Sequence, residues 1–197
     1  MNAAPHLFWI TSRAAGGAAL LLSSAAVALG LMMASGAKSV SKRDLRAVHE
    51  ALSLATLSMV ALHGVSLLGD AWLHPGLTGI SIPFAGAYRP IWTGLGIVAA
   101  YGLAALGLSY YLRNRIGAAL WRRAHRLTAA FWLLAVAHTI GAGSDATEWW
   151  FLALSTAAVV PVTVLLAARW LGADTESEGG AAARRPPGAE PPVMESR

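Results

Sequence analysis

The 197-residue chain is too apolar for an ordinary soluble domain. Hydrophobic residues make up 56% of it and charged residues only 13%, whereas soluble domains contain about 25% charged residues. The absence of cysteine excludes disulfides, thiolate chemistry and cysteine-ligated iron–sulfur clusters. The formal net charge is +5, but the basic residues lie in short segments between apolar runs rather than on a soluble face. We therefore expect no nucleic-acid partner.

Five apolar stretches are long enough to cross a bilayer, whose hydrocarbon core of about 30 Å needs about 20 helical residues. In chain order they cover residues 9–35, 45–69, 91–112, 118–140 and 148–171. Glycines in the first and third stretches allow close helix contacts in lipid. They are Gly16, Gly17, Gly94, Gly96, Gly102 and Gly107. The sequence therefore predicts an all-α polytopic bundle of five transmembrane helices in the plasma membrane, with the lipid bilayer as its first partner.

The loops between these stretches differ in charge. Basic residues gather between the first and second stretches and between the third and fourth, whereas the other two loops hold Arg89 and the acids Asp145 and Glu148. Because positively charged loops stay in the cytoplasm, we expect the N-terminus outside and the C-terminus inside. We expect one domain over residues 1–172, followed by a disordered cytoplasmic tail over residues 173–197.

Four of the six histidines lie in only two of the predicted helices. His49 and His63 are in the second, and His125 and His138 are in the fourth. One span separates these helices, so they run in the same direction. The histidines then form one pair near the cytoplasmic face and one pair toward the outside. Ionisable residues within a span are costly and by default mark function.

The histidine spacing suits two haems stacked across one membrane. The separations of 14 residues (49 to 63) and 13 residues (125 to 138) each correspond to about 20 Å at about 1.5 Å per residue. Imidazole is a usual axial ligand of haem iron, and two imidazoles leave no open position, which favours electron transfer over oxygen binding. The spacing leaves one mismatch, because His125 and His138 point about 140° apart on an ideal helix.

The pairs His49-x13-His63 and His125-x12-His138 resemble the ferric reductase-like transmembrane domain. Other stretches resemble its bacterial single-domain members: TSRAAGG at 11–17, PFAGAYRPIWTGLG at 83–96 and GAGSDA at 141–146. The resemblance covers about residues 7–170. Its superfamily includes NADPH oxidases, ferric-chelate reductases and the haem-binding membrane subunit of the periplasmic methionine sulfoxide reductase system. It implies two haem b groups, an inner one held by His49 and His125 and an outer one held by His63 and His138.

The resemblance also implies electron transfer from a cytoplasmic flavin donor to an acceptor outside, such as ferric chelate. In the oxidases an aromatic side chain lies between the haems, and Phe131 matches that position; the alternative is that Phe131 packs or faces lipid. Arg13 and Arg89 are the outer cations near helix ends, where haem propionates need positive charge. The alternative for both arginines is a topology charge or a lipid-phosphate contact.

Relatives that bind FAD and NADPH themselves continue into nucleotide-binding domains, whereas no GxGxxG motif occurs here. We therefore expect FAD and NAD(P)H to bind elsewhere, and the donor to be a separate flavoprotein, reduced flavin or quinol. The chain would then be the electron-transfer component of an oxidoreductase. Two alternatives stay open: a haem-binding subunit or anchor of a separate periplasmic reductase, and a structural membrane subunit without haem. A small transporter is disfavoured because no Asp or Glu lies in the middle of a predicted span, and Glu50, the nearest candidate, is close to a helix end.

Overall fold

The computed structural model describes residues 4–35 and 41–183, and over this part the chain forms helices and no strand. The all-α prediction is therefore confirmed. The elements are α1 (Ala4–Ala34), α2 (Lys42–Leu68), α3 (Gly76–Ser81), α4 (Pro90–Leu108), the 3₁₀ helix η1 (Ser109–Leu112), α5 (Arg113–Ile116), α6 (Ala118–His125), α7 (Thr128–Ala142) and α8 (Trp149–Ala183). The sequence did not predict the short helix α3 in the loop between the second and third apolar stretches.

Four segments of the described chain are long and apolar enough to cross a membrane. They are His6–Ala34, Lys42–Leu68, Pro90–Ile116 and Trp149–Leu171. The third runs through α4, η1 and α5. Large apolar side chains point outward from these segments, Val65 and Val164 being 62% and 60% exposed. Such exposure suits a surface that faces lipid rather than water, and the chain is a multi-pass membrane protein, as expected.

The stretch 118–140, predicted as one helix, is two helices, so that prediction is wrong. α6 and α7 are separated by a tight turn in which the Leu127 N–H donates to the Ala124 carbonyl at 2.9 Å. The sequence offers a physical reason, since α6 ends among Arg122, Arg123 and Arg126. Charged side chains resist entering the hydrocarbon region, so the chain turns at the basic cluster before the apolar α7 begins.

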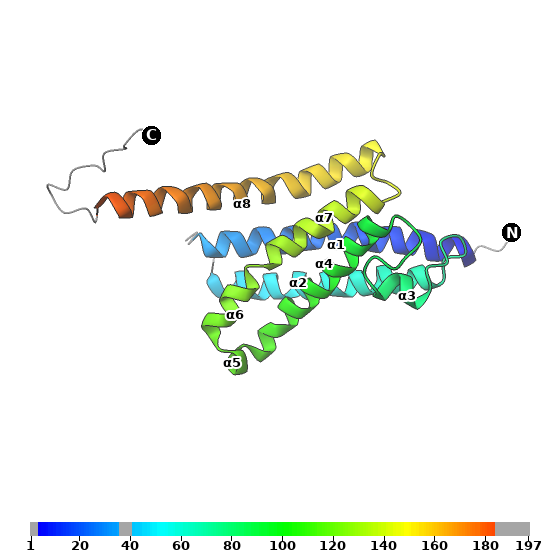
Figure 1. The fold of residues 1–197 in the computed structure, drawn as a ribbon, viewed down its shortest axis with the longest axis horizontal. Coiled ribbons are helices and arrows are strands. Elements are labelled where there is room, and N and C mark those ends of the chain that lie inside the picture. The colour runs from blue at the N-terminus through cyan, green and yellow to red at the C-terminus, as the bar shows by residue number, and fades with distance from the viewer. Residues whose placement is uncertain (1–3, 36–40, 184–197) are drawn as a thin grey trace, which may run out of the picture.

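Two antiparallel helix pairs form the core of the bundle. α1 packs along α2, and α4 packs along α7, while α8 lies against α1 (Figure 1). Between α1, α7 and α8 the fully buried Trp132 contacts Val27 and Val162. α2 and α7 run in the same direction (Figure 1) but do not pack closely against each other. The two pairs meet where α1 contacts α7 and where α2 contacts α4. The four histidines lie in α2, in α7 and at the end of α6.

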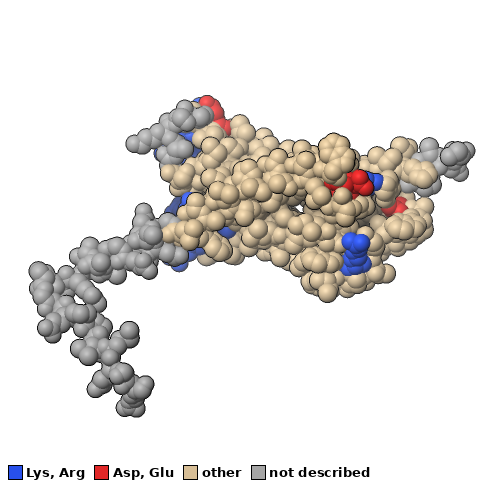
Figure 2. Space-filling view, turned by 90° about the horizontal axis from the view of Figure 1, so that it is seen from above, with Lys and Arg blue, Asp and Glu red and all other residues tan. Residues whose placement is uncertain are grey.

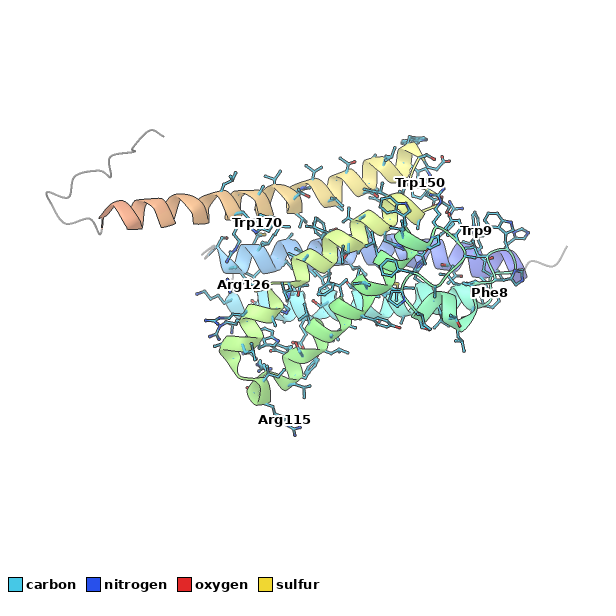
Figure 3. All side chains as sticks on the ribbon, viewed as in Figure 1. Phe8, Trp9, Arg115, Arg126, Trp150 and Trp170 are labelled. Carbon is cyan, nitrogen blue, oxygen red and sulfur yellow. The ribbon has the colours of Figure 1, made fainter. Side chains whose placement is uncertain are left out.

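Charge differs between the two ends of the bundle. Basic side chains gather mainly at the end where α2 begins and where α5 and α6 lie (Figure 2). They include Lys42, Arg43, Arg46, Arg113, Arg115, Arg122, Arg123 and Arg126. Figure 3 shows Phe8, Trp9 and Trp150 at the opposite end from Arg115 and Arg126. Aromatic residues favour membrane–water interfaces, so these side chains mark one edge of the apolar band.

Two parts of the sequence prediction fall partly or wholly outside the described residues. The tail predicted over residues 173–197 begins within α8, which continues to Ala183, and residues 184–197 lie outside the described part. Lys38, one of the basic residues between the first two spans, also lies outside it. The difference in charge between the two ends of the bundle is therefore argued from the described basic residues alone.

Candidate functional site

The four histidines of α2, α6 and α7 form two pairs. His49 lies beside His125, with ring centres 6.2 Å apart, and His63 lies beside His138, with ring centres 6.3 Å apart. His49 and His63 are separated by about 21 Å along α2, at about 1.5 Å per residue. The structure therefore brings together the side chains that the sequence pairs, at two depths in the bundle.

The turn between α6 and α7 removes the mismatch expected for a single ideal helix. A 3₁₀-type bond turns the chain more tightly than an α-helical bond, and the helix axis also changes direction at this point (Figure 1). As a result both His125 and His138 approach histidines of α2. No proline or glycine occurs at positions 126 and 127, so the usual sequence markers of a break do not reveal this turn.

Backbone carbonyls hold three of the four imidazoles through Nδ1. The contacts are His49 Nδ1 to Ala26 O at 2.9 Å, His63 Nδ1 to Ser12 O at 2.8 Å, and His138 Nδ1 to Trp92 O at 2.9 Å. A carbonyl oxygen can only accept, so in these bonds Nδ1 carries the proton and donates. Nε2 is then the ring nitrogen with a free lone pair, as a metal-bound imidazole requires.

His125 is held by an aromatic contact instead. Its ring stacks on Trp121, with ring centres 4.8 Å apart and an angle of 22° between the planes. Among the side chains that the structure describes, His125 Nδ1, Trp121 Nε1 and Thr128 Oγ1 are buried without a hydrogen-bond partner. Buried polar atoms nearly always have partners. A bound group with polar substituents at this corner would supply them.

The donor set of each histidine pair fits a haem iron. The porphyrin supplies four nitrogen ligands, and two axial imidazoles complete six-coordination. A metal–imidazole bond of about 2 Å places the two ring centres about 6 Å apart across the metal, and the observed separations are 6.2 and 6.3 Å. No cluster of three or more His, Cys, Asp or Glu side chains that could hold a metal ion occurs in the described part of the chain.

Phe131 lies on the same side of α7 as His138. Seven residues make nearly two full helical turns. Phe131 therefore lies about two turns from His138 toward the basic end of the bundle, at a depth between the two histidine pairs. Its half-buried ring packs against Gly102 of α4, where an added Cβ would collide with it. The neighbouring Trp132 points into the core formed with α1 and α8, and its Nε1 donates to the Ser24 hydroxyl at 3.1 Å.

Arg13 forms an ion pair at the end of the bundle opposite the basic cluster. Its Nε donates to Asp145 Oδ2 at 2.9 Å, and its Nη2 pairs with Oδ1. The guanidinium carbon also lies 4.0 Å from the centre of the Trp9 ring, a cation–π contact. The pair connects α1 to the loop that precedes α8.

Replacing Asp145 by asparagine is expected to lower the apparent free energy of unfolding in detergent by about 1–3 kcal/mol. Removing one member of a buried ion pair costs about 3–5 kcal/mol, and solvent reduces this cost because the Arg13 side chain is 30% exposed. Thermal denaturation followed by circular dichroism measures the effect. Glu148→Gln, an exposed acid in the same loop, is the matched control. Equal stability of the two variants would contradict the assigned role of the pair.

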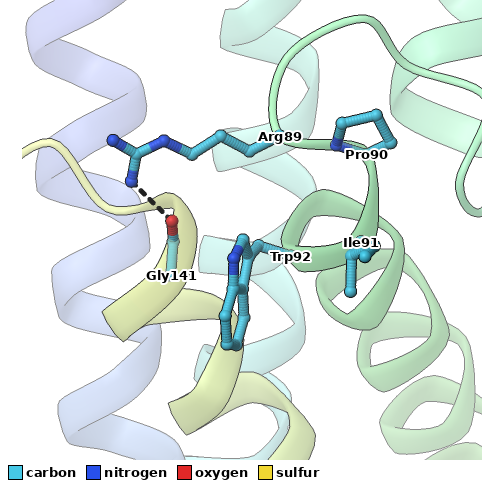
Figure 4. A pocket seen from close by; sticks show the side chains of 5 residues that line it. All are labelled: Arg89, Pro90, Ile91, Trp92 and Gly141. Carbon is cyan, nitrogen blue, oxygen red and sulfur yellow. Dashed lines mark hydrogen bonds between the residues drawn. The ribbon is translucent and has the colours of Figure 1, made fainter.

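Arg89 lies at the start of α4, beside the end of α7. Its Nη1 donates to the Gly141 carbonyl at 2.6 Å, as Figure 4 shows. It borders an open hollow of about 300 Å³ together with four other residues. They are Pro90, Ile91, Trp92 and Gly141 (Figure 4). The Trp92 carbonyl also binds His138, so the hollow lies close to the outer histidine pair.

A comparison with protein families found a match over residues 15–136 to the family described as ferric reductase like transmembrane component. The chain belongs to this family. The matched residues contain His49, His63, His125 and Phe131, and they end two residues before His138. No curated protein and no solved structure matched the chain. The match places the chain in a family that is associated with electron transfer across membranes.

Sequence reasoning missed two contributors to this site. Trp121, which stacks on His125, lies in a basic segment that the sequence analysis used only for orientation. The carbonyls of Ser12, Ala26 and Trp92 bind three of the imidazoles, and a backbone acceptor leaves no trace in residue type. The sequence holds one indirect indication, the positions of glycines in α1 and α4, considered below.

Proposed function

We propose that this ferric reductase-like protein transfers electrons across the plasma membrane through two bis-histidine haem b groups. The electrons would come from a cytoplasmic flavin or flavoprotein and go to an extracytoplasmic acceptor such as ferric chelate. The observation that carries the proposal is the presence of two imidazole pairs at two depths, each with the ring separation that axial ligation needs. Haem b, when bound, supplies an iron that gains and loses one electron without binding substrate.

The chain's own residues hold and insulate the cofactors. In the proposal His49 and His125 are the inner ligands, and His63 and His138 are the outer ligands. Hydrogen bonds from Nδ1 to carbonyls raise the basicity of Nε2 and fix the ring orientation. Phe131, at the intermediate depth, is proposed to lie between the two haems. The apolar helices around these residues exclude water and keep the local dielectric low.

The two outer arginines differ as partners for a haem propionate. The Arg13 charge is already paired with the Asp145 carboxylate, whereas the described contacts of Arg89 are with neutral groups, the Gly141 carbonyl and the Tyr88 ring. Arg89 also lies next to Trp92, whose carbonyl holds His138. We therefore place the propionate contact of the outer haem first at Arg89, with Arg13 as the second cation available.

The proposal includes a topology. The N-terminus lies outside, and α6 and α7 together make the fourth of five crossings. Residues 1–172 form the membrane domain, and residues 173–197 lie in the cytoplasm. It is supported by the basic side chains at one end of the bundle (Figure 2) and by the positive-inside rule. FAD and NAD(P)H would be bound by a separate flavoprotein, and reduced flavin or quinol are the other candidate donors. A periplasmic reductase partner is the alternative acceptor to ferric chelate.

Electron transfer across vesicle membranes tests the proposal. The haem-loaded protein is reconstituted into vesicles that enclose ferricyanide, and reduced flavin mononucleotide is added outside. We expect the ferricyanide absorbance to fall much faster than in protein-free vesicles. His6→Ala, an exposed histidine outside both pairs, should transfer at the wild-type rate. A haem-loaded wild-type protein that transfers no faster than empty vesicles would contradict the proposal.

A further inference from the structure

Each carbonyl that binds a membrane histidine is followed, four residues later, by a glycine. The carbonyl of Ser12 precedes Gly16, that of Ala26 precedes Gly30, and that of Trp92 precedes Gly96. Gly16 and Gly30 are separated by 14 residues in α1, the same separation as that of His49 and His63 in the antiparallel α2. The two spacings keep both histidines of α2 in register with their acceptors on α1.

The relation has a direct geometric reason. In an α-helix the carbonyl of residue i accepts the N–H of residue i+4, and its second lone pair stays available. The Cβ of residue i+4 leans back toward the helix N-terminus, so it covers the side from which a second donor must approach. Glycine at i+4 has no Cβ, and it leaves the carbonyl open to an imidazole N–H.

The space beside each glycine shows how closely the imidazoles approach. A Cβ added at Gly96 would lie 2.5 Å from His138 Nδ1, and one added at Gly16 would lie 3.1 Å from His63 Nδ1. At Gly30 the nearest atom is His49 Cε1, at 3.4 Å. In all three places the nearest atom belongs to a membrane histidine. An alanine would push against the imidazole at Gly96 and Gly16, whereas at Gly30 it would only just touch the ring.

We infer that Gly16, Gly30 and Gly96 are positioning residues that fix three of the four haem ligands by opening the carbonyl to which each imidazole binds. The inference rests on the proposed haem ligation, and it adds residues that the ligation alone does not assign. These glycines act through His63, His49 and His138 and do not touch the reacting iron themselves.

His125 is held differently from the other three histidines. His125 Nδ1 makes no hydrogen bond to the described residues, and the ring is held by stacking on Trp121. The outer pair thus has two carbonyl-anchored ligands and the inner pair has one.

Glycine-to-alanine variants test the inference, with haem content, electron paramagnetic resonance of the oxidised protein and redox titration as readouts. We expect Gly96→Ala to lose one of the two haems. Gly16→Ala should keep both, with changed low-spin g values and a raised midpoint potential of one haem, because a less basic imidazole stabilises ferric iron less. Gly30→Ala should change the g values and the midpoint potential less than Gly16→Ala, because its added Cβ would lie farther from the imidazole.

Two other glycines provide controls, Gly17 in α1 and Gly64 in α2. A Cβ added at Gly17 would make an ordinary contact of 3.8 Å with Phe151, and one added at Gly64 would meet nothing within 4 Å. Gly17→Ala and Gly64→Ala should match the wild type in all three readouts. The inference is overturned if Gly96→Ala retains two haems with wild-type spectra and potentials, or if the controls change as much as the three test variants.

A double variant separates ligand positioning from helix packing. Alanine is a better helix former than glycine, so weakened helices cannot explain a loss in Gly96→Ala. If Gly96 acts through the His138 ring, adding Gly96→Ala to His138→Ala should cause no further loss of folded protein or haem. An equal loss in both backgrounds would show a packing role alone. Wild-type protein without haem would instead contradict the proposed function.

Discussion

Replacing His63 by alanine is expected to lower the haem content from two per chain to one and to reduce transmembrane electron transfer to the rate of protein-free vesicles. His63 is one of the two imidazoles of the outer pair, and haem held by two axial histidines is not retained firmly by one. The remaining pair is about 21 Å away along α2. The pyridine haemochromogen spectrum and the vesicle assay measure the two effects.

The pairing makes a stricter prediction about combinations of variants. His138→Ala should lose the same haem as His63→Ala, so the double variant should still hold one haem. Combining His63→Ala with His49→Ala should leave none, because the changes remove one ligand from each pair. His6→Ala, outside both pairs, should hold two. A double variant of His63 and His138 without haem, or a single variant with two, would contradict the assigned pairing.

Replacing Trp132 by alanine is expected to lower the apparent free energy of unfolding by about 3–5 kcal/mol, the usual cost of truncating a buried aromatic side chain to alanine. Trp132 is fully buried and packs with Val27 and Val162. Its removal would also leave the Ser24 hydroxyl without the indole N–H that donates to it. Denaturant titration in detergent, followed by circular dichroism, measures the loss.

The neighbouring Phe131 provides the control for this prediction. It is only half-buried and packs on Gly102 rather than in the core, so Phe131→Leu should change stability by less than Trp132→Ala. Trp132→Phe should cost less than Trp132→Ala, since most of the buried volume is kept. If Trp132→Ala were as stable as the wild type, the core between α1, α7 and α8 would not have the arrangement described here.

Much of the fold follows from apolar length and charge. The first, second, third and fifth apolar stretches each contain a helix able to cross a membrane, because a run of about 20 apolar residues has few alternatives in lipid. The relation of the histidine-bearing helices also follows from the order of the spans. Helices separated by one crossing run the same way, and α2 and α7 do so (Figure 1).

The details of the site depend on features that residue patterns do not carry. The turn between α6 and α7 occurs without proline or glycine and arises from where Arg122, Arg123 and Arg126 can lie. Periodicity alone therefore predicted one straight helix over residues 118–140. The Arg13–Asp145 pair joins residues 132 positions apart, and no local pattern connects them. The glycine spacing in α1 was visible, but its meaning needed the carbonyl contacts of α2.

The ratio of haem b to polypeptide in the purified wild-type protein tests the central claim most directly. The pyridine haemochromogen spectrum gives the amount of haem, and amino-acid analysis gives the amount of chain. The two imidazole pairs predict a ratio of two, with low-spin ferric signals from bis-imidazole ligation. A folded protein that is produced in haem-replete cells and carries no haem would contradict the account.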